Sequence, residues 1–220
     1  MSQSSIYVFD AYGTLFDVHA AAGAYADQIG SSWTRMSEVW RAKHLEYTWI
    51  YAQTGRHTTF WQLTEQSLDT AIASVGGIPD GLKPKLLAAY RELDAYAEVP
   101  SVLASLKERG AQLAILTNGD PDMIADATRS AGLDSVLDRI ITVHEAGVFK
   151  PDMRVYKLVT NAFGCAPGGV SFQSSNRWDI TGAHVFGFRT VWINRSGAPA
   201  EYPETPPDRT ASDLTALLEN

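Results

Sequence analysis

Four polar clusters in this chain of 220 residues have the types and positions of groups that could do chemistry. Asp10 ends the apolar run that starts at Ile6, and a Gly-Thr turn follows almost at once. Thr117-Asn118 and Ser174-Ser175-Asn176 each follow a further apolar run, and Lys150 comes after another. A bare carboxylate at the end of a hydrophobic strand is a candidate reactive group. The four clusters together are far more specific than any one of them.

The elements that must position these clusters alternate between short apolar strands and helices. Strands are expected within 5–9, 111–119, 139–143, 169–175 and 189–194. Helices are expected within 99–110, 120–132, 150–164 and 176–187, followed by a proline-rich loop over 195–209 and a last helix within 210–220. Asp120 and Pro121 have the types of an N-cap and a first helical residue. This alternation predicts an α/β protein with a doubly wound parallel sheet, and the clusters lie at the carboxyl ends of its strands.

Residues 17–97 have helical patterning and no convincing strand. Met36, Trp40, His44 and Tyr47 recur at helical spacing and predict one buried stripe. We therefore expect residues 17–97 to form an inserted helical cap, with a core domain made of residues 1–16 and 98–220. The aromatic side chains of the cap also favour a homodimer.

Composition excludes several classes of partner. The net charge of −7, with no cluster of Lys or Arg, argues against nucleic acid. No apolar stretch is long enough to span a membrane, and the first ten residues lack the features of a secretory signal. The single Cys165 excludes an internal disulfide, so a cytoplasmic location is expected.

The clusters lie in four motifs, "DAYGTL", "ILTNG", "VFKPDMRVY" and "SSNRWDITGA". In order and spacing these resemble the motifs of the haloacid dehalogenase superfamily. The stretches "WRAKHLEYTWI" and "FGFRTVWINRSG" resemble the L-2-haloacid dehalogenases in particular. The resemblance implies a Rossmann-like core with a helical cap. It also implies hydrolysis of short L-2-haloacids to D-2-hydroxyacids through an aspartyl ester, with no metal and no cofactor.

The resemblance assigns roles to individual residues. The implied catalytic set is Asp10, Thr14, Arg41, Thr117, Lys150, Tyr156, Ser174, Asn176 and Asp179. The implied substrate-binding set is Ala11, Tyr12, Arg41, Leu45, Phe60, Thr117, Asn118 and Trp178. In this assignment Asp10 is the nucleophile and Lys150 keeps it ionised and oriented. Arg41, Asn118 and Trp178 surround the halide, while Asn176 and Asp179 position or activate the hydrolytic water.

Two positions distinguish this reaction from phosphate transfer. Superfamily phosphatases have a second aspartate two residues after the nucleophile, where this chain has Tyr12. That aspartate protonates a departing alkoxide, whereas halide is a weak base that needs no proton. Ser175 stands where a metal-binding acid is expected, which leaves few carboxylates for Mg²⁺. Both positions favour attack of Asp10 on carbon.

Other interpretations stay open at this stage. Asp10 alone could cap a strand, and Lys150 or Arg41 alone could be surface residues. The chain could also be a superfamily phosphatase, or a binding protein that kept the fold without catalysis. It departs from the L-2-haloacid dehalogenases at Ala42, where that family usually has glutamine, and this affects the expected size of the pocket. His184 could assist the water, but the sequence offers no clear partner for it.

Overall fold

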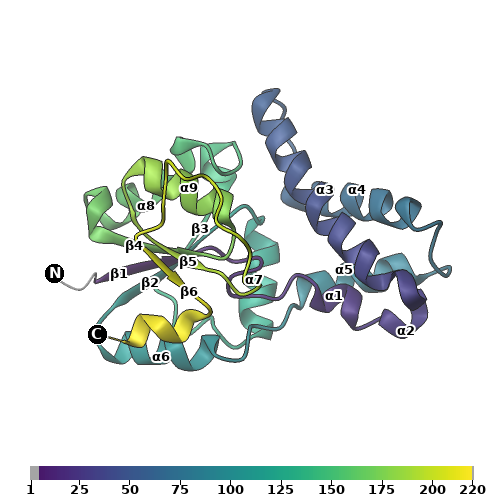
Figure 1. The fold of residues 1–220 in the computed structure, drawn as a ribbon, viewed down its shortest axis with the longest axis horizontal. Helices are drawn as coiled ribbons and strands as arrows, with labels where there is room; N and C mark the ends of the chain where they lie inside the picture. Colours follow the sequence, from purple (N-terminus) through teal and green to yellow (C-terminus); the bar gives the residue numbers. More distant parts are fainter. Residues whose placement is uncertain (1–4, 220) are drawn as a thin grey trace.

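A six-stranded parallel sheet forms the centre of the protein in a computed structural model that describes residues 5–219 (Figure 1). The strand order is β3-β2-β1-β4-β5-β6. The strands are β1 Ile6–Phe9, β2 Gln112–Thr117, β3 Arg139–Thr142, β4 Val170–Ser174, β5 Arg189–Ile193 and β6 Arg209–Ala211. The central strands are buried on both faces, and their side chains are largely β-branched or aromatic. The predicted α/β class with a parallel sheet is confirmed.

Helices cover both faces of this sheet. They are α6 Val99–Glu108, α7 Pro121–Ser130, α8 Met153–Phe163 and α9 Arg177–Phe186. Short 3₁₀ turns lie at η2 Val143–Ala146, η3 Pro167–Gly169 and η4 Leu214–Leu218. Figure 1 shows α8 and α9 on one side of the sheet and α6 with η4 on the other. This arrangement leaves the carboxyl ends of the strands as the edge where the predicted clusters meet.

A group of helices lies to one side of the sheet in Figure 1, and we call α1 to α5 the helical segment. Its members are α1 Ala20–Gly23, α2 Ala26–Ile29, η1 Gly30–Ser32, α3 Trp33–Gln53, α4 Phe60–Ser74 and α5 Leu82–Arg91. Met36, Trp40 and His44 are buried along α3 as the stripe predicts, and Tyr47 is half-buried. The indole Nε1 of Trp40 donates to the Thr64 carbonyl at 3.0 Å and so joins α3 to α4.

The structure corrects four details. Arg209, expected in the proline-rich loop, begins β6, which pairs in parallel with β5, and the final helix is the 3₁₀ turn η4. The Asp208 carboxylate supports this edge strand by accepting from the Thr190 amide and hydroxyl at 2.7 and 3.0 Å. Helix α8 begins at Met153, so Lys150 lies ahead of it rather than within it. The fourth detail concerns Asp120, which has the N-cap position of α7 but makes no side-chain hydrogen bond to it.

Residues 1–4 and 220, which the predicted core includes, lie outside the described residues. Within 5–219, no helix has both the length and the apolar character needed to cross a membrane.

Candidate active site

The Asp10 carboxylate lies directly after β1 and is almost closed off from solvent, with 6% of the residue exposed. Its amide continues the sheet ladder by donating to the Gln173 carbonyl at 2.9 Å. Oδ2 accepts three hydrogen bonds, from Thr14 Oγ1 at 3.0 Å, Asn176 Nδ2 at 2.7 Å and Ser174 Oγ at 3.3 Å. Oδ1 accepts from Lys150 Nζ at 3.1 Å. The two oxygens of one carboxylate therefore have different surroundings.

The Lys150 amine joins Asp10 to a second carboxylate. Its Nζ lies 2.7 Å from Asp179 Oδ2, and Lys150 and Asp179 are both fully buried. The Tyr156 hydroxyl donates to the other Asp179 oxygen at 2.7 Å. Gly182 makes room for this tyrosine, since a Cβ there would lie 2.3 Å from the Tyr156 hydroxyl. The Lys150 cluster and the Ser174-Ser175-Asn176 cluster of the sequence thus converge on Asp10, and Lys150 also joins Asp179 to it.

Burial and charge oppose each other in this cluster. Burial would lower the pKa of the Lys150 amine, but the Asp10 and Asp179 carboxylates outweigh burial and raise it. Burial raises the pKa of Asp179 to about 6, although Lys150 and the Tyr156 hydrogen bond act in the opposite direction. Burial and the Asp179 charge also hold the pKa of Tyr156 well above its ordinary value. At neutral pH the Asp179 carboxyl is therefore mostly ionised, and Asp10 and Asp179 share the one lysine cation.

Arg41 brings a second cation to this site from α3. Its Nη2 donates to the Tyr12 carbonyl at 2.9 Å and to Asn176 Oδ1 at 3.1 Å. Asn176 thus contacts Arg41 with its carbonyl oxygen and Asp10 with its amide nitrogen. Gly13 lies close beneath, because a Cβ at this position would be 3.8 Å from Arg41 Nη2. The helical segment and the sheet edge therefore share one polar network.

Aromatic side chains form an apolar wall beside this network. The Tyr12 ring lies 5.5 Å from the Phe60 ring and stacks on Tyr90 at 5.7 Å between centroids. Ala11, Tyr12 and Phe60 are buried, and Leu45 is half-buried one turn along α3 from Arg41.

Three of the predicted residues make contacts other than those expected. Thr117 Oγ1 accepts from the Gly119 amide at 3.0 Å, which stabilises the turn after β2. Asn118 Oδ1 accepts from the Lys150 amide at 2.9 Å, so it holds the segment that carries the lysine. Trp178 is half-buried and meets Trp49 of α3 edge to face at 5.6 Å. The predicted grouping of Asn118 and Trp178 with Arg41 around a halide remains a prediction.

Two buried aromatic neighbours of the site were not identified as site residues from the sequence. Tyr90 stacks on Tyr12 and also lies 5.0 Å from the Trp40 ring. His44 packs on Phe60 at 4.0 Å, and burial, followed by the charge of Arg41, lowers the pKa of His44 to about 3. His44 is therefore a neutral structural histidine, and the helical spacing of the sequence indicated only that it is buried. His184 Nδ1 is buried with no partner among the described residues.

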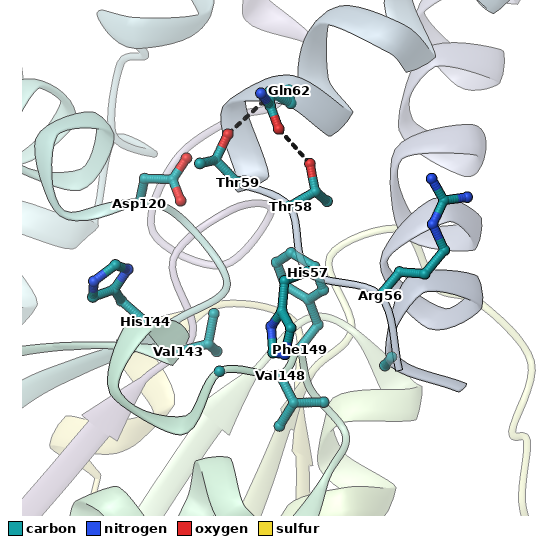
Figure 2. Close-up of a pocket in the computed structure, with 12 residues that line it drawn as sticks. Arg56, His57, Thr58, Thr59, Gln62, Asp120, Val143, His144, Val148 and Phe149 are labelled. Carbon is teal, nitrogen blue, oxygen red and sulfur yellow. Dashed lines mark hydrogen bonds between the residues drawn. The ribbon is translucent and has the colours of Figure 1, made fainter. Parts of the chain in front are cut away.

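Two cavities lie beside the carboxylate cluster rather than over it. One of about 350 Å³ lies between the loop and first turn of α4 on one side and the η2 region on the other (Figure 2). Figure 2 shows Thr58 and Thr59 at the start of α4 and His144 on the side of η2, with His57 and Phe149 between them in this view. The other, of about 410 Å³, is lined by Trp49, Trp178 and Phe149, among others. Phe149 lines both spaces together with Ala52 of α3, and it directly precedes Lys150. Both cavities therefore lie between the helical segment and the chain segment that carries Lys150.

The carboxylates do not fit the Mg²⁺ site of superfamily phosphatases. Among residues 5–219, no group of three or more His, Cys, Asp or Glu side chains is arranged to hold a metal ion. Lys150 Nζ lies within hydrogen-bond distance of both Asp10 and Asp179, so a divalent cation bound to these carboxylates would lie beside a positive charge. Ser175 supplies a backbone amide to Thr14 Oγ1 at 2.8 Å and no carboxylate.

A buried carboxylate at the edge of a parallel sheet, paired with a lysine, is the arrangement of a hydrolase that attacks with aspartate. The haloacid dehalogenase-like hydrolase family matches residues 5–187. The "(S)-2-haloacid dehalogenase 1" of Pseudomonas sp. (strain CBS-3) is 44% identical over 96% of this chain and 93% of its own length. The chain therefore belongs to the haloacid dehalogenase-like hydrolases, within the group of (S)-2-haloacid dehalogenases.

Solved structures agree with this assignment. A dehalogenase with an intermediate complex has a TM-score of 0.96 and is 40% identical, covering 99% of this chain and 96% of its own. The L-2-haloacid dehalogenase of Xanthobacter autotrophicus with chloropropionic acid covalently bound has a TM-score of 0.88 and is 34% identical. It covers 97% of this chain and 96% of its own.

Proposed function

We propose that this protein hydrolyses short L-2-haloacids to D-2-hydroxyacids through an ester on Asp10, without a metal ion. The observation that carries the proposal is the asymmetric environment of the Asp10 carboxylate. Lys150 alone contacts Oδ1 among the described residues, while three neutral donors hold Oδ2. Relatives and neighbours with the same architecture bear the names of L-2- or (S)-2-haloacid dehalogenases.

In the first step, Oδ1 displaces halide from C2 of the substrate in line, so that carbon is inverted and an ester forms. Oδ1 keeps lone pairs for this attack because its single hydrogen bond comes from Lys150. Arg41 delocalises its charge over a planar guanidinium, which suits a large, weakly basic halide. The apolar wall of Tyr12 and Phe60 excludes bulk water from the reacting carbon.

In the second step, water attacks the Asp10 carbonyl carbon and gives up a proton, and the bond to Oδ1 breaks. That oxygen takes up the proton, so the product leaves with it as its hydroxyl. Oδ2 is then the ester carbonyl oxygen. Thr14, Ser174 and Asn176 already donate to Oδ2 and would stabilise the oxyanion that develops there. Asp179, with its pKa raised to about 6, suits a base that takes a proton from this water near neutral pH.

A chloride-release assay with chloroacetate and with each enantiomer of 2-chloropropionate tests this function. We expect release from chloroacetate and from the L enantiomer, with D-lactate as the product of the latter. Hydrolysis of p-nitrophenyl phosphate that depends on Mg²⁺, with no chloride release, would instead support a phosphatase. Neither activity, in a folded protein, would support a non-catalytic binding protein.

The proposal extends to organisation and location. Residues 1–16 and 98–220 would form the core and residues 17–97 a cap, supported by the absence of strands from 17–97. A homodimer is supported by Ile50 on α3, which is 54% exposed, and cytoplasmic location by the single cysteine. Light scattering of the purified protein and fractionation of the source cells test these two points.

A further inference from the structure

We propose that Asp120 is a positioning residue that fixes the first turn of α4 and thereby holds Phe60 against the reaction site. Its Oδ1 accepts from the Phe60 amide at 3.1 Å, and its Oδ2 accepts from the Trp61 amide at 2.8 Å. Asp120 comes from the turn after β2, and Phe60 begins a helix of the helical segment. The inference rests on the proposed function, since it concerns how the substrate pocket is closed.

The chemistry of a helix start explains why a carboxylate suits this position. The first four amides of a helix have no partner within it, and they carry partial positive charge. Thr59 caps α4 through one of them, by accepting from the Gln62 amide at 3.1 Å. Asp120 accepts from two others with an ionisable group, which makes both hydrogen bonds charge-assisted. The cap of this helix is therefore completed by a residue about sixty positions away.

Both ends of this connection are fixed to the site. Phe60 is 2% exposed, and its ring contacts Tyr12 at 5.5 Å and Phe149 at 6.3 Å. The turn that carries Asp120 packs tightly on the same tyrosine, because a Cβ at Gly119 would lie 2.8 Å from Tyr12 Cε2. A shift of the first turn of α4 would therefore separate Phe60 from Tyr12 and open the apolar wall beside Asp10.

A second connection, from α5 to α7, is weaker. Arg91 of α5 pairs with Asp122 and Asp126 of α7 at 2.9 and 2.8 Å, and its guanidinium lies over the Trp61 ring at 4.4 Å. The Asp122 side chain is 65% exposed, and exposed ion pairs contribute little. Asp120 is half-buried and accepts directly from two amides of α4, whereas the Arg91 connection reaches α4 only through the Trp61 ring.

Amide hydrogen exchange in the substrate-free protein tests the placement directly. We compare Asp120→Ala, which removes both acceptors, with Asp120→Asn, which keeps one. Asp213→Ala is the matched control, because Asp213 caps η4 through the Thr215 amide at 2.8 Å far from the site. Asp120→Ala should speed exchange at the Phe60 and Trp61 amides about tenfold, the usual effect of losing a helix cap, and Asp120→Asn should give a smaller change. The control should leave both amides unchanged.

Kinetics then test the consequence for the site. With chloroacetate, Asp120→Ala should raise KM about tenfold and change kcat less than about threefold, since the loss affects pocket closure rather than Asp10. Asp120→Asn should raise KM less than Asp120→Ala does. The Asp213→Ala control should have the KM and kcat of the wild type.

Unchanged exchange at Phe60 and Trp61 in a folded Asp120→Ala protein would overturn the proposal, as would a loss confined to kcat. Thermal unfolding checks that each variant is folded, and Asp120→Asn carries the test if Asp120→Ala is not. If the wild type releases no chloride, the proposed function fails, and the exchange data still decide whether Asp120 positions Phe60.

Discussion

Replacing Lys150 with methionine should lower both the free energy of unfolding and the activity, because two buried carboxylates lose their cation. The lysine side chain is fully buried, and its Nζ pairs with Asp10 at 3.1 Å and with Asp179 at 2.7 Å. Methionine has a similar length and no charge, so the substitution leaves two buried carboxylates without their cation. Removing one partner of a buried ion pair typically costs about 3–5 kcal/mol. We expect a loss of this size in the free energy of unfolding at pH 8, together with a loss of activity of at least about a thousandfold.

The loss should depend on pH in a defined direction. In the wild type, the pKa of Asp179 is raised to about 6, so the folded state binds a proton more tightly than the unfolded state. The contribution of Asp179 to stability is therefore fully present below about pH 4 and is lost as the pH rises through about 6. Lys150 lowers the pKa of Asp179, so without this cation the pKa of Asp179 rises further and the Asp179 contribution to stability keeps falling above pH 6. The difference between variant and wild type should then grow by about 1.4 kcal/mol per pH unit above pH 6.

Denaturant unfolding at pH 5, 6, 7 and 8, followed by circular dichroism, measures these differences, and chloride release measures activity. Lys107→Met is the matched control, because Lys107 pairs with Asp138 where both side chains are partly exposed. This control should lose less than about 1 kcal/mol at every pH. A Lys150→Met protein that loses no more than the control, or an equal amount at pH 5 and pH 8, would refute the shared-cation interpretation.

Five further outcomes follow from the site. Asp10→Asn should abolish turnover in a folded protein, and chloride release within about tenfold of wild type would contradict an Asp10 nucleophile. A single turnover in ¹⁸O water should place label in the peptide containing Asp10, whereas label appearing first in the product would indicate direct attack on C2. Tyr156→Phe removes a hydrogen bond that lowers the pKa of Asp179. The acid limb of the pH profile of kcat/KM should therefore move to higher pH, and an unmoved limb would exclude Asp179 as the base. Arg41→Lys should slow chloride and bromide release unequally, and an equal loss would contradict a role of Arg41 at the halide. Full activity should persist after EDTA treatment of the wild type, and a requirement for Mg²⁺ would contradict the metal-free reaction.

The alternation of apolar runs and helices was sufficient to predict the parallel sheet, because buried parallel strands are short and apolar on both faces. It failed at Arg209, which begins the edge strand β6 within a polar, proline-rich stretch. An edge strand is only three residues long here and half solvated, so its sequence has no apolar run to detect. Strand β6 forms because it pairs with β5 and because Asp208 accepts hydrogen bonds from Thr190, not because of the local propensity of its residues.

The site was partly predictable for a different reason. Asp10 and Lys150 follow β1 and β3, Ser174 ends β4 and Asn176 follows it. The fold rule for parallel sheets brings such positions to one edge. Contacts from the helical segment have no comparable rule. The hydrogen bond of Arg41 to Asn176 spans 135 positions, and only a resemblance to a known family singled out Arg41. Asp120 was assigned to its own helix by local chemistry, but its carboxylate caps another helix instead.

The charge balance of the cluster favours a monovalent substrate over a phosphate ester. Two carboxylates, Asp10 and Asp179, face two cations, Lys150 and Arg41, so the ionised site is formally neutral. A haloacid brings one negative charge, and displacement moves the charge of Asp10 onto the departing halide without changing the total. The reaction thus shifts charge from beside Lys150 to beside Arg41, and each cation serves one end of that shift. A phosphate monoester brings about two negative charges near neutral pH, and phosphatases of this superfamily offset them with Mg²⁺. Here Lys150 holds both carboxylates that such an ion would need, so the same arrangement that prepares Asp10 to attack carbon disfavours phosphoryl transfer.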